Sequence, residues 1–540
     1  MLLESKPHQH GGRGLILSPS SPSGNPECLT ELARDLTGFV TQAVQNGTSF
    51  ADFETGVFQR VLAMGGIAAD LFLKAQGDGD LGQTVCTAQG IELHRSDKVQ
   101  MRKLRTIFKE HSFESFVYSR GAKQKIELRP IDARLNLPEH KASYLLQEFT
   151  QLFCIEDAFG VGAGQFERIF KQKISVDVLE KINREMGASA DRFLEEQLQK
   201  PKAEDEGQLL ILTADGKGVP LVQSDAKKVP AFDAKERPGN RRMATLGCVY
   251  TVDRFPRTPE QIVAALFRDA TEDRPKEKRP EACFKHYRSY FAYAASGQEP
   301  IPGGVRTWTW LAQEAGKRYR VGQPIIRLMD GQASLWEAAD MCLSEFLQEQ
   351  NAGQKDQKDT NAKEQKKADD VLAIDILDIL HVSSYVWRAA KVFHGHKEQQ
   401  EAFAQERLLA ILRGEIASVV KGLRWMATRY NLQDARLGEI ATVCTYFENN
   451  AKRMRYDEYL REGYPIATGV IEGACRHVIK DRMEQGGMRW TLKGAESMLD
   501  LRAVNASCEV ERFHVWRQEE EAKRVHPHRE LVVGYDGFKA

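Results

Sequence analysis

The chain has 540 residues, enough for about two to four domains of the usual ~100–200 residues each. Hydrophobic residues make up 42 % of it and charged residues 28 %, a composition typical of a globular protein with buried cores. Lys+Arg and Asp+Glu are equal at 76 each, so the overall charge does not indicate a nucleic-acid partner. Any surface that binds nucleic acid must therefore be local.

The nine cysteines occur singly along the chain, and no two have CxxC spacing. This pattern suggests neither a zinc knuckle nor a redox dithiol, and it fits reduced thiols in a cytosol. No uninterrupted apolar run approaches the ~18 residues typical of a membrane span. Residues 1–27 lack the compact apolar stretch of a signal peptide and are expected to be a disordered leader. We therefore expect a cytoplasmic protein without a membrane segment.

Residues 28–200 are expected to form a mainly helical DNA-binding region. Apolar residues recur at helical spacing over 28–75, and residues 91–135 carry eleven Lys/Arg against six Asp/Glu. The 91–135 segment also contains short β-like runs, SFVYS and KIELRPI. Within the helical block 140–200, QFERIFKQKISVDVLEKINREMG splits at Ile174-Ser175 into two helices. This split resembles a helix-turn-helix, and a plain helical hairpin is an equal alternative.

The pattern changes after the polar linker 200–207. Four apolar runs predict strands (QLLILTADGKGVPLV, MATLGCVYTVD, QPIIRLMDG and VLAIDILDILH), and helical patterns intervene at 259–270 and 332–349. Strands that alternate with helices predict an α/β core over 208–382 with partly parallel pairing. Residues 351–370 hold no large hydrophobic residue and are expected to be a flexible loop. Residues 383–462 are predicted to be a helical insertion, 463–510 to return to the core, and 511–540 to be a tail without chemistry.

Two aspartates follow apolar runs, and each precedes a glycine. Asp215 comes after LLILTA, and Asp330 comes after PIIRLM. A strand end holds a side chain rigidly, the glycine allows a substrate backbone to approach closely, and carboxylate oxygens suit Mg2+. A turn-forming Asp-Gly after a strand is the alternative for either residue alone.

A third acid, Glu472, lies in YPIATGVIEGACRHVIKDRMEQGGMRW, in the opening turns of a predicted helix. Arg476 and Lys480 follow at i+4 and i+8 and are expected on the same helical face. A carboxylate with two cations behind it could hold a metal ion while the cations bind phosphates. An ordinary surface glutamate with helical ion pairs is the alternative.

Two further groups of residues are candidates for accessory roles. Asp378 and His381 lie three residues apart at the end of an apolar run, where they could lie near a metal site or only order a loop. The nearby Trp387 fits a core better than a stack on DNA bases. Basic residues also gather between 227 and 242, and the group ERPGNRR is expected to be a loop that touches a phosphate backbone, with a merely solvated loop as the alternative. Its arginines are Arg237, Arg241 and Arg242.

The segment 208–505 resembles the bacterial ISKra-type insertion-sequence transposases. The resemblance rests on ILTADGKGVP, RPGNRR with MATLGCVYTVD, LMDGQASLW, DILHVSSYVWRAA, and TGVIEGACRHVIKDRMEQGGMRWTLKGAESMLDLRA, in that order. It implies an RNase H-like catalytic core with a helical insertion before the last acid, and it implies that Asp215, Asp330 and Glu472 are the catalytic, metal-binding acids. Asp378 and His381 resemble a paired Asp/His motif of related transposases. Arg489 and Trp490, in the last segment, are expected to contact DNA.

The implied reaction is phosphoryl transfer with two Mg2+ or Mn2+ ions. It would cleave the terminal inverted repeats of an insertion sequence and join them to target double-stranded DNA, in a bacterial, nucleoid-associated protein. Pairing two ends requires a homodimer or larger assembly. Relatives often carry paired cysteines in the region corresponding to 86–125; here only Cys86 is present, and no zinc is predicted. An RNase H-like endonuclease without strand transfer and a non-enzymatic DNA-binding protein derived from a transposase are the alternatives.

Overall fold

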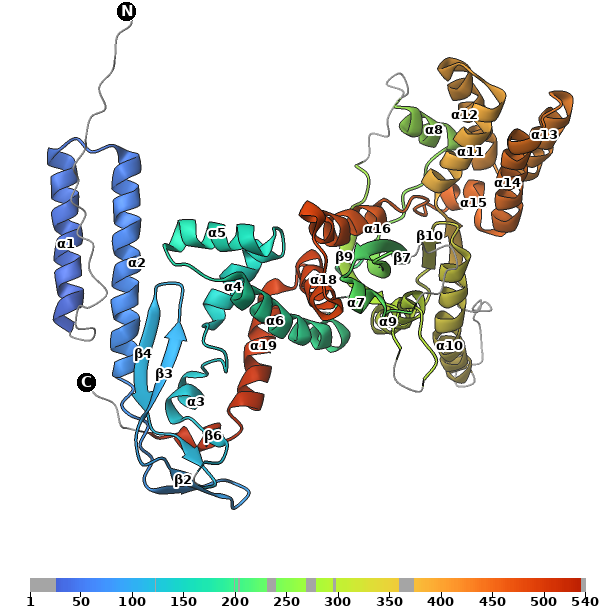
Figure 1. The fold of residues 1–540 in the computed structure, drawn as a ribbon. Coiled ribbons are helices and arrows are strands. Elements are labelled where there is room, and N and C mark those ends of the chain that lie inside the picture. Colours follow the sequence, from blue (N-terminus) through green and yellow to red (C-terminus); the bar gives the residue numbers. More distant parts are fainter. Residues whose placement is uncertain are drawn as a thin grey trace, which may run out of the picture. The chain divides into compact units, whose positions relative to one another are not determined.

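The structure is a computed structural model that describes residues 26–121, 123–198, 200–202, 204–230, 239–268, 278–294, 298–358 and 373–535. The chain folds into two compact units (Figure 1). The first unit comprises Met1–Thr150, Gly164–Ile174 and Trp516–Ala540, and the second comprises Gln151–Ala163 and Ser175–Val515. The units therefore do not follow the linear division expected from the sequence. Part of 28–200 belongs to the second unit, and most of the expected tail belongs to the first.

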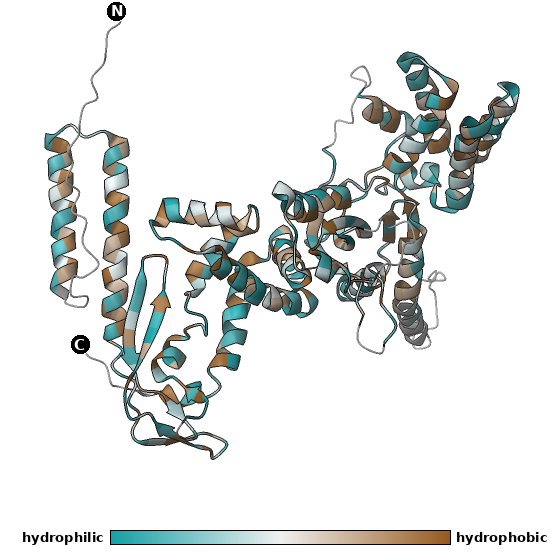
Figure 2. Ribbon diagram, in the orientation of Figure 1, coloured by the Kyte–Doolittle hydropathy of each residue, from teal (hydrophilic) through white to brown (hydrophobic). Residues whose placement is uncertain are grey.

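The first unit begins with a helical hairpin, α1 (Pro26–Gln45) and α2 (Phe50–Lys74). The Ser49 side chain caps α2 by accepting a hydrogen bond from the Asp52 amide, and Phe39 stacks on Phe53 with 5.7 Å between ring centroids. Hydrophobic residues recur along both helices (Figure 2), and several large ones are exposed.

By length and composition, α2 is the one helix among the described residues that could span a membrane, and 17 % of its most apolar stretch is buried. A single helix of this kind is weak evidence for a membrane span.

Six short strands, two short helices and parts of three longer helices, which continue into the second unit, complete the first unit. One sheet has the order β1-β2-β5-β6, and β3 pairs with β4 in a second. The bounds are β1 (Thr84–Cys86), β2 (Glu92–Arg95), β3 (Gln100–Arg105), β4 (Glu110–Ser115), β5 (Tyr118–Ser119), β6 (Ile126–Leu128), α3 (Pro130–Leu135), α4 (Tyr144–Cys154), α5 (Phe159–Phe170), α19 (Val510–Val525) and η4 (Arg529–Val532). The region expected to be mainly helical thus contains two small sheets. Val532 packs in the same core as Leu93 and Tyr118, so the C-terminal segment is part of this fold.

The helix after the predicted helix-turn-helix break, α6 (Val176–Glu196), is a core helix of the second unit. One face of α6, including Leu179, Ile182 and Met186, is buried, and α6 packs closely on α18 (Leu492–Ala506). At Gly187 the two helices approach so closely that a Cβ atom would lie 2.3 Å from the Ser497 Cβ. Because this face is buried, it is not available to read DNA.

The second unit is built on a five-stranded sheet of order β11-β10-β7-β8-β9. Strands β7 (Leu209–Pro220), β8 (Arg241–Val252) and β9 (Cys283–Phe291) form an antiparallel meander, and β10 (Ile325–Met329) and β11 (Ala373–Leu377) add in parallel to β7. The four predicted strands are confirmed, and β9 is additional. The expected turn after Asp215 is wrong, because β7 continues to Pro220 in register with β8.

Helices connect and follow these strands. Their bounds are α7 (Gln223–Ala226), α8 (Pro259–Phe267), α9 (Gly303–Arg318), α10 (Ala333–Lys358), α11 (Ile379–Phe393), α12 (Lys397–Leu412), α13 (Ile416–Arg429), α14 (Asp434–Asn450), η1 (Ala451–Arg453), α15 (Tyr456–Arg461), α16 (Gly469–Ala474), η2 (Cys475–Lys480), α17 (Asp481–Met483) and η3 (Gln485–Gly487). The segment predicted to be helical, 383–462, contains most of α11 and all of α12–α15. Helix α10 extends to 358, into the expected loop 351–370, and the rest of that loop lies outside the described residues.

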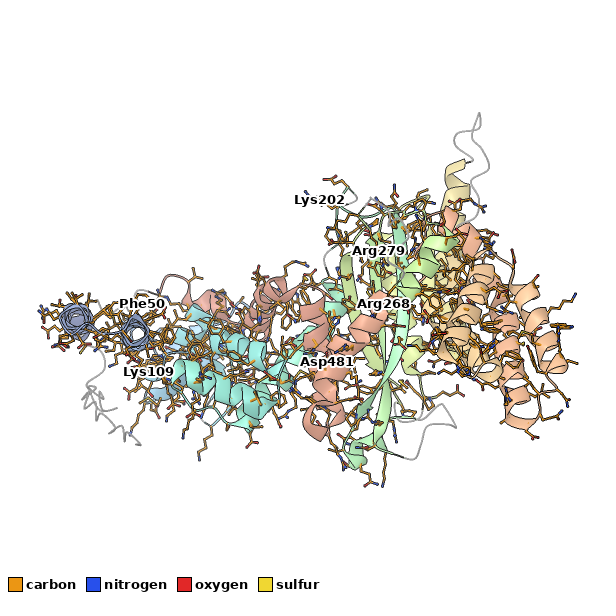
Figure 3. All side chains as sticks on the ribbon, turned by 90° about the horizontal axis from the view of Figure 1, so that it is seen from above. Phe50, Lys109, Lys202, Arg268, Arg279 and Asp481 are labelled. Carbon is orange, nitrogen blue, oxygen red and sulfur yellow. The ribbon has the colours of Figure 1, made fainter. Side chains whose placement is uncertain are left out.

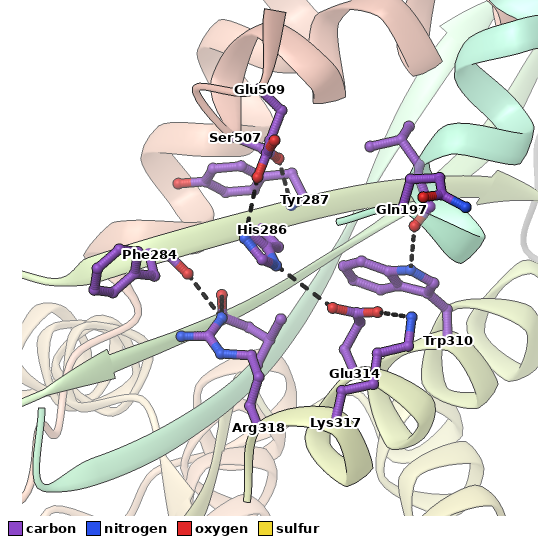
Figure 4. Close-up of polar contacts among 12 residues, drawn as sticks. Gln197, Phe284, His286, Tyr287, Trp310, Glu314, Lys317, Arg318, Ser507 and Glu509 are labelled. Carbon is purple, nitrogen blue, oxygen red and sulfur yellow. Dashed lines mark hydrogen bonds and ion pairs between the residues drawn. The ribbon is translucent and has the colours of Figure 1, made fainter. Parts of the chain in front are cut away.

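A buried polar network fastens α9 to β9 (Figure 4). The His286 Nδ1 lies 3.4 Å from a Glu314 carboxylate oxygen, and the Lys317 ammonium donates to the other oxygen at 2.6 Å. Arg318 donates to the Phe284 carbonyl at 2.8 Å. Burial alone would raise the pKa of Glu314, but hydrogen bonds from His286 and Lys317 outweigh it, and the pKa lies below its ordinary value. His286 of β9 can be buried because α9 supplies its partner, Glu314.

Candidate functional site

Three aspartates lie in or directly after the neighbouring strands β7, β10 and β11. Ile325 of β10 pairs with Leu210 of β7 and with Ala373 of β11. Asp330, Asp215 and Asp378 come five residues after Ile325, Leu210 and Ala373, respectively. Partners in a parallel register carry their side chains on the same face of a sheet. The pairing thus brings Asp330 and Asp378 to the carboxyl ends of β10 and β11, and Asp215, within β7, lies near enough to Asp330 for that charge to raise its pKa.

Asp215 lies within β7, opposite Leu246 of β8, and is half-buried. The pKa of its carboxyl is raised chiefly by burial and also by the charge of Asp330, while hydrogen bonds from the Gly216 amide and the Cys475 thiol act in the opposite direction. The Gly216 amide bond measures 2.7 Å. The mutual repulsion of Asp215 and Asp330 is the kind of charge that a bound cation would relieve.

Asp330 follows β10 and is also half-buried. One oxygen of its carboxylate accepts a hydrogen bond from the Gln332 amide at 3.0 Å, and the indole of Trp336 donates to the Asp330 carbonyl at 2.7 Å. The chain is thus fixed on both sides of the carboxylate.

Asp378 has different surroundings. It is fully buried, and it caps α11 by accepting hydrogen bonds from the amides of Leu380 and His381 at 3.3 and 2.9 Å. It also accepts from the Thr468 amide at 3.0 Å, at the beginning of α16. Asp378 therefore joins the insertion to the helix that carries Glu472. Burial raises the pKa of Asp378, and Glu472 adds to the rise.

Glu472 is exposed in the first turn of α16, and its carboxylate accepts a hydrogen bond from the Thr468 hydroxyl at 3.1 Å. The following residues, Cys475–Lys480, form a π-helix. Arg502 of α18 donates to the carbonyls of His477 and Val478, the latter at 2.8 Å, and so provides partners for carbonyls that an α-helix would satisfy internally. A π-turn changes the helical spacing, so the expected α-helical face of Glu472, Arg476 and Lys480 does not continue through this segment.

No Lys or Arg side chain forms an ion pair with Asp215, Asp330, Asp378 or Glu472 in the described part of the chain. The four groups are hard oxygen donors, the kind that Mg2+ and Mn2+ prefer. Among the described residues, however, no three His, Cys, Asp or Glu side chains are grouped closely enough to form a ready metal site. The donor chemistry of the four carboxylates nevertheless fits a divalent cation.

The basic residues expected to bind DNA have varied positions. Arg241 and Arg242 begin β8, not a loop; Arg241 is exposed and pairs with Glu484, and Arg242 is half-buried. Arg241 pairs in register with Pro220, about 17 Å along β7 from Asp215 at ~3.3 Å per residue. Arg237 lies outside the described residues.

The other four expected DNA-binding residues follow Glu472. Arg476, Lys480 and Arg489 are exposed, and Arg476 lies 3.7 Å from Asp481, which Figure 3 labels. Trp490 is 6 % exposed, and its indole donates to the Met483 carbonyl at 3.1 Å. Because Trp490 is a core residue, the prediction that it contacts DNA is not supported by its position.

Two residues near the acids were not singled out by the sequence reasoning. Cys475 is buried one turn after Glu472, and its thiol donates to the Asp215 carboxylate; burial first, and then the charge of Asp215, raises its pKa far above the ordinary value. Tyr446, from α14, lies against Gly331. Cys475 stands three residues from Glu472, so helical spacing could have pointed to it. Tyr446 is 116 residues from Asp330, and no local pattern joins them.

No protein-family model matches this sequence, and no curated protein matches it. Among solved structures, a chain of the "Drosophila P element transposase strand transfer complex" is similar at 10 % sequence identity. The match covers 69 % of this chain and 80 % of that chain, with a TM-score of 0.21. A score this low does not establish a shared fold.

Proposed function

We propose that this protein is a DNA transposase whose catalytic acids are Asp215, Asp330 and Glu472. The proposal is carried by one observation: Asp215 in β7, Asp330 after β10 and Asp378 after β11 come from neighbouring strands, and Asp378 anchors the helix of Glu472 beside them. Acids that lie far apart in sequence are thus tied to one place in the fold.

The five-stranded sheet is proposed to be an RNase H-like core. Its support is the strand order: a three-stranded antiparallel meander is extended by two parallel strands beside its first strand. The insertion α11–α15 interrupts the core between the second and third proposed acids, as the resemblance to ISKra-type transposases implies. The motifs of that resemblance lie on β7, β8, β10, α11 and α16.

Two divalent cations, Mg2+ or Mn2+, would lower the barrier to attack on a DNA phosphate and stabilise the leaving oxygen. In this proposal Asp215 and Asp330 hold the cations from the rigid sheet, and Glu472 closes the site from α16. The Cys475 thiol and the Thr468 hydroxyl orient two of these carboxylates. Asp378 holds the two helix beginnings together.

DNA is the proposed partner, as ends of an insertion sequence and as target. The exposed Arg241, Arg476, Lys480 and Arg489 are proposed to bind phosphates. Two ends must be held together for joining, so a dimer or larger assembly in the bacterial cytoplasm is part of the proposal.

The test is metal-dependent cleavage and joining of linear DNA that carries the flanking ends of the element. Wild type is compared with Asp215→Asn, Asp330→Asn and Glu472→Gln, and with Glu398→Gln as a control at an exposed acid of α12. We expect the three site variants to lose at least about 100-fold in cleavage rate while DNA binding persists. The control should cleave like wild type.

Each other outcome has a definite meaning. Cleavage without joining would favour an RNase H-like endonuclease. DNA binding without any metal-dependent cleavage by wild type would favour a non-enzymatic DNA-binding protein. Unchanged cleavage by one site variant would show that its acid is wrongly assigned.

A further inference from the structure

The helical insertion contributes one polar group to the acid site, the hydroxyl of Tyr446. This oxygen is buried and has no hydrogen-bond partner among the described residues. Burial chiefly raises the pKa of this hydroxyl, and Tyr385, Asp330 and Asp378 add to the rise in that order. The hydroxyl is therefore a donor, held next to acceptors without a bond to any of them.

The Tyr446 ring is held rigidly in this position. It stacks on Tyr385 of α11 with 3.8 Å between centroids and 4° between planes, and Arg388 covers Tyr385 with its guanidinium carbon 4.5 Å from the ring centroid. Gly331 leaves the space for the ring. A Cβ atom at Gly331 would lie 2.5 Å from the Tyr446 Cε2 and 2.6 Å from its Oη. The glycine after Asp330 thus admits a tyrosine from the insertion.

The other two proposed catalytic acids already have neutral donors. The Cys475 thiol donates to Asp215, and the Thr468 hydroxyl donates to Glu472. A neutral donor orients a carboxylate without cancelling the charge that attracts a cation, whereas a Lys or Arg would cancel it. Among the described residues, the Asp330 carboxylate accepts from the Gln332 amide alone, on one of its two oxygens.

We propose that Tyr446 is a positioning residue of the acid site, whose hydroxyl donates to the Asp330 carboxylate when a divalent cation is bound and so fixes its orientation. This inference rests on the proposed function. The hydroxyl has no hydrogen-bond partner among the described residues and lies close enough to Asp330 to be affected by its charge, so it is available to donate to that carboxylate.

The test compares Tyr446→Phe with Tyr385→Phe, two variants that each lose one hydroxyl and keep the stacked rings. Mn2+ binding without DNA is measured by electron paramagnetic resonance, and DNA cleavage is measured over a range of Mg2+ concentrations. We expect Tyr446→Phe to bind Mn2+ at least about 10-fold more weakly and to need correspondingly more Mg2+. Tyr385→Phe should stay within about twofold of wild type.

The melting temperature of the metal-free protein separates positioning from a structural role. Removing a buried hydroxyl without a partner should leave the melting temperature of Tyr446→Phe unchanged or raised, whereas loss of a structural bond would lower it. Gly331→Ala, which displaces the ring, should weaken Mn2+ binding in the same direction.

Wild-type Mn2+ affinity in Tyr446→Phe would overturn the inference. Mn2+ binding by Asp330→Asn distinguishes an error in the role of Tyr446 from an error in the proposed metal site. If wild type and Asp330→Asn bind Mn2+ equally, the metal site itself is wrong, whatever Tyr446→Phe does.

Discussion

Asp330 and Asp378 follow the neighbouring strands β10 and β11, but their surroundings differ and indicate different roles. Asp330 is half-buried and accepts one amide hydrogen bond, while Asp378 is fully buried and accepts three. A carboxylate whose oxygens are occupied by amides has little capacity left for a cation. The structure thus favours an anchoring role for Asp378 over a metal-binding one.

This difference predicts the effect of asparagine at the two positions. Asparagine caps helices about as well as aspartate, so Asp378→Asn should keep cleavage within about 10-fold of wild type. Asp330→Asn should reduce cleavage by at least about 100-fold. Both rates are measured on the same DNA at saturating Mg2+. A larger loss for Asp378→Asn than for Asp330→Asn would contradict the assignment.

Complete removal of the anchor should affect stability as well. Asp378→Ala leaves three amides, of which that of Thr468 is buried, without their acceptor and should lower the free energy of unfolding by about 1–3 kcal/mol. Urea denaturation followed by circular dichroism measures this. Equal stability of Asp378→Ala and wild type would show that the three hydrogen bonds contribute little.

At this scale the sequence predicted Asp215 and Asp330 because an Asp-Gly after an apolar run is visible locally. It could not predict that Asp378 is an anchor, because its third donor, the Thr468 amide, is 90 residues away. Nor could it predict Tyr446, since only the packing of the insertion against Gly331 places that ring. Partners of a side chain are set by tertiary structure, which periodicity does not describe.

At the scale of elements, apolar runs in the sequence predict four strands of the five-stranded sheet, but they do not predict β9. Its sequence, CFKHYRSYF, alternates charged with aromatic residues, and His286 and Arg288 are nevertheless buried. Burial is possible because Glu314 faces His286 and Asp500 faces Arg288 at 3.0 Å. A strand buried through ion pairs lacks the hydrophobic pattern from which strands are inferred.

The network on β9 predicts a pH-dependent stability. The folded-state pKa of Glu314 lies below its ordinary value of 4.5, so its contribution is present above about pH 4.5 and is lost as pH falls through the folded pKa. Glu314→Gln should lower the free energy of unfolding by about 1.5–3 kcal/mol at neutral pH, and the gap to wild type should narrow in acid. Urea denaturation of both proteins from pH 7 to about pH 3 checks this. A difference in the free energy of unfolding that does not change with pH would contradict this prediction.

The close approach of α6 and α18 makes a second prediction for the elements. Gly187→Ala should lower the free energy of unfolding by about 1–3 kcal/mol, because the new methyl group would overlap Ser497. Gly422→Ala in α13 is the matched control: a Cβ there meets nothing within 4 Å, and the change should stabilise by about 0.5–1 kcal/mol. Thermal denaturation should show a lower melting temperature than wild type for Gly187→Ala and a higher one for Gly422→Ala.

For the whole molecule, the sequence predicted the order of regions but not how they assemble. The first unit takes residues from three separate segments, including Trp516–Ala540. The His526 imidazole lies 2.8 Å from the Leu137 carbonyl, and the Tyr535 hydroxyl accepts from the Gly79 amide at 3.0 Å. The short charged segment after residue 510 has no sequence pattern that connects it to Gly79 or Leu137. The sequence alone therefore predicts only a tail there.

Removal of residues 526–540 should therefore damage the first unit selectively. It takes away Val532 from the core of Leu93 and Tyr118, together with the bonds to Leu137 and Gly79. Hydrogen–deuterium exchange should show loss of protection in β2, β5 and β6, and little change in β7–β11. Equal loss of protection in both units would contradict the division of the chain.

The interleaving of the first unit has a consequence for its synthesis. A ribosome releases Met1–Thr150 long before Trp516, and at about 5–20 residues per second the interval is roughly 20–70 s. During that time β2, β5 and β6 have no Val532 to cover them, while every segment of the second unit has been made before the first is complete. The nascent chain thus exposes an unfinished sheet and the apolar hairpin α1–α2 throughout the translation of the acid site. Chaperone binding should concentrate on these early residues until the last ones emerge.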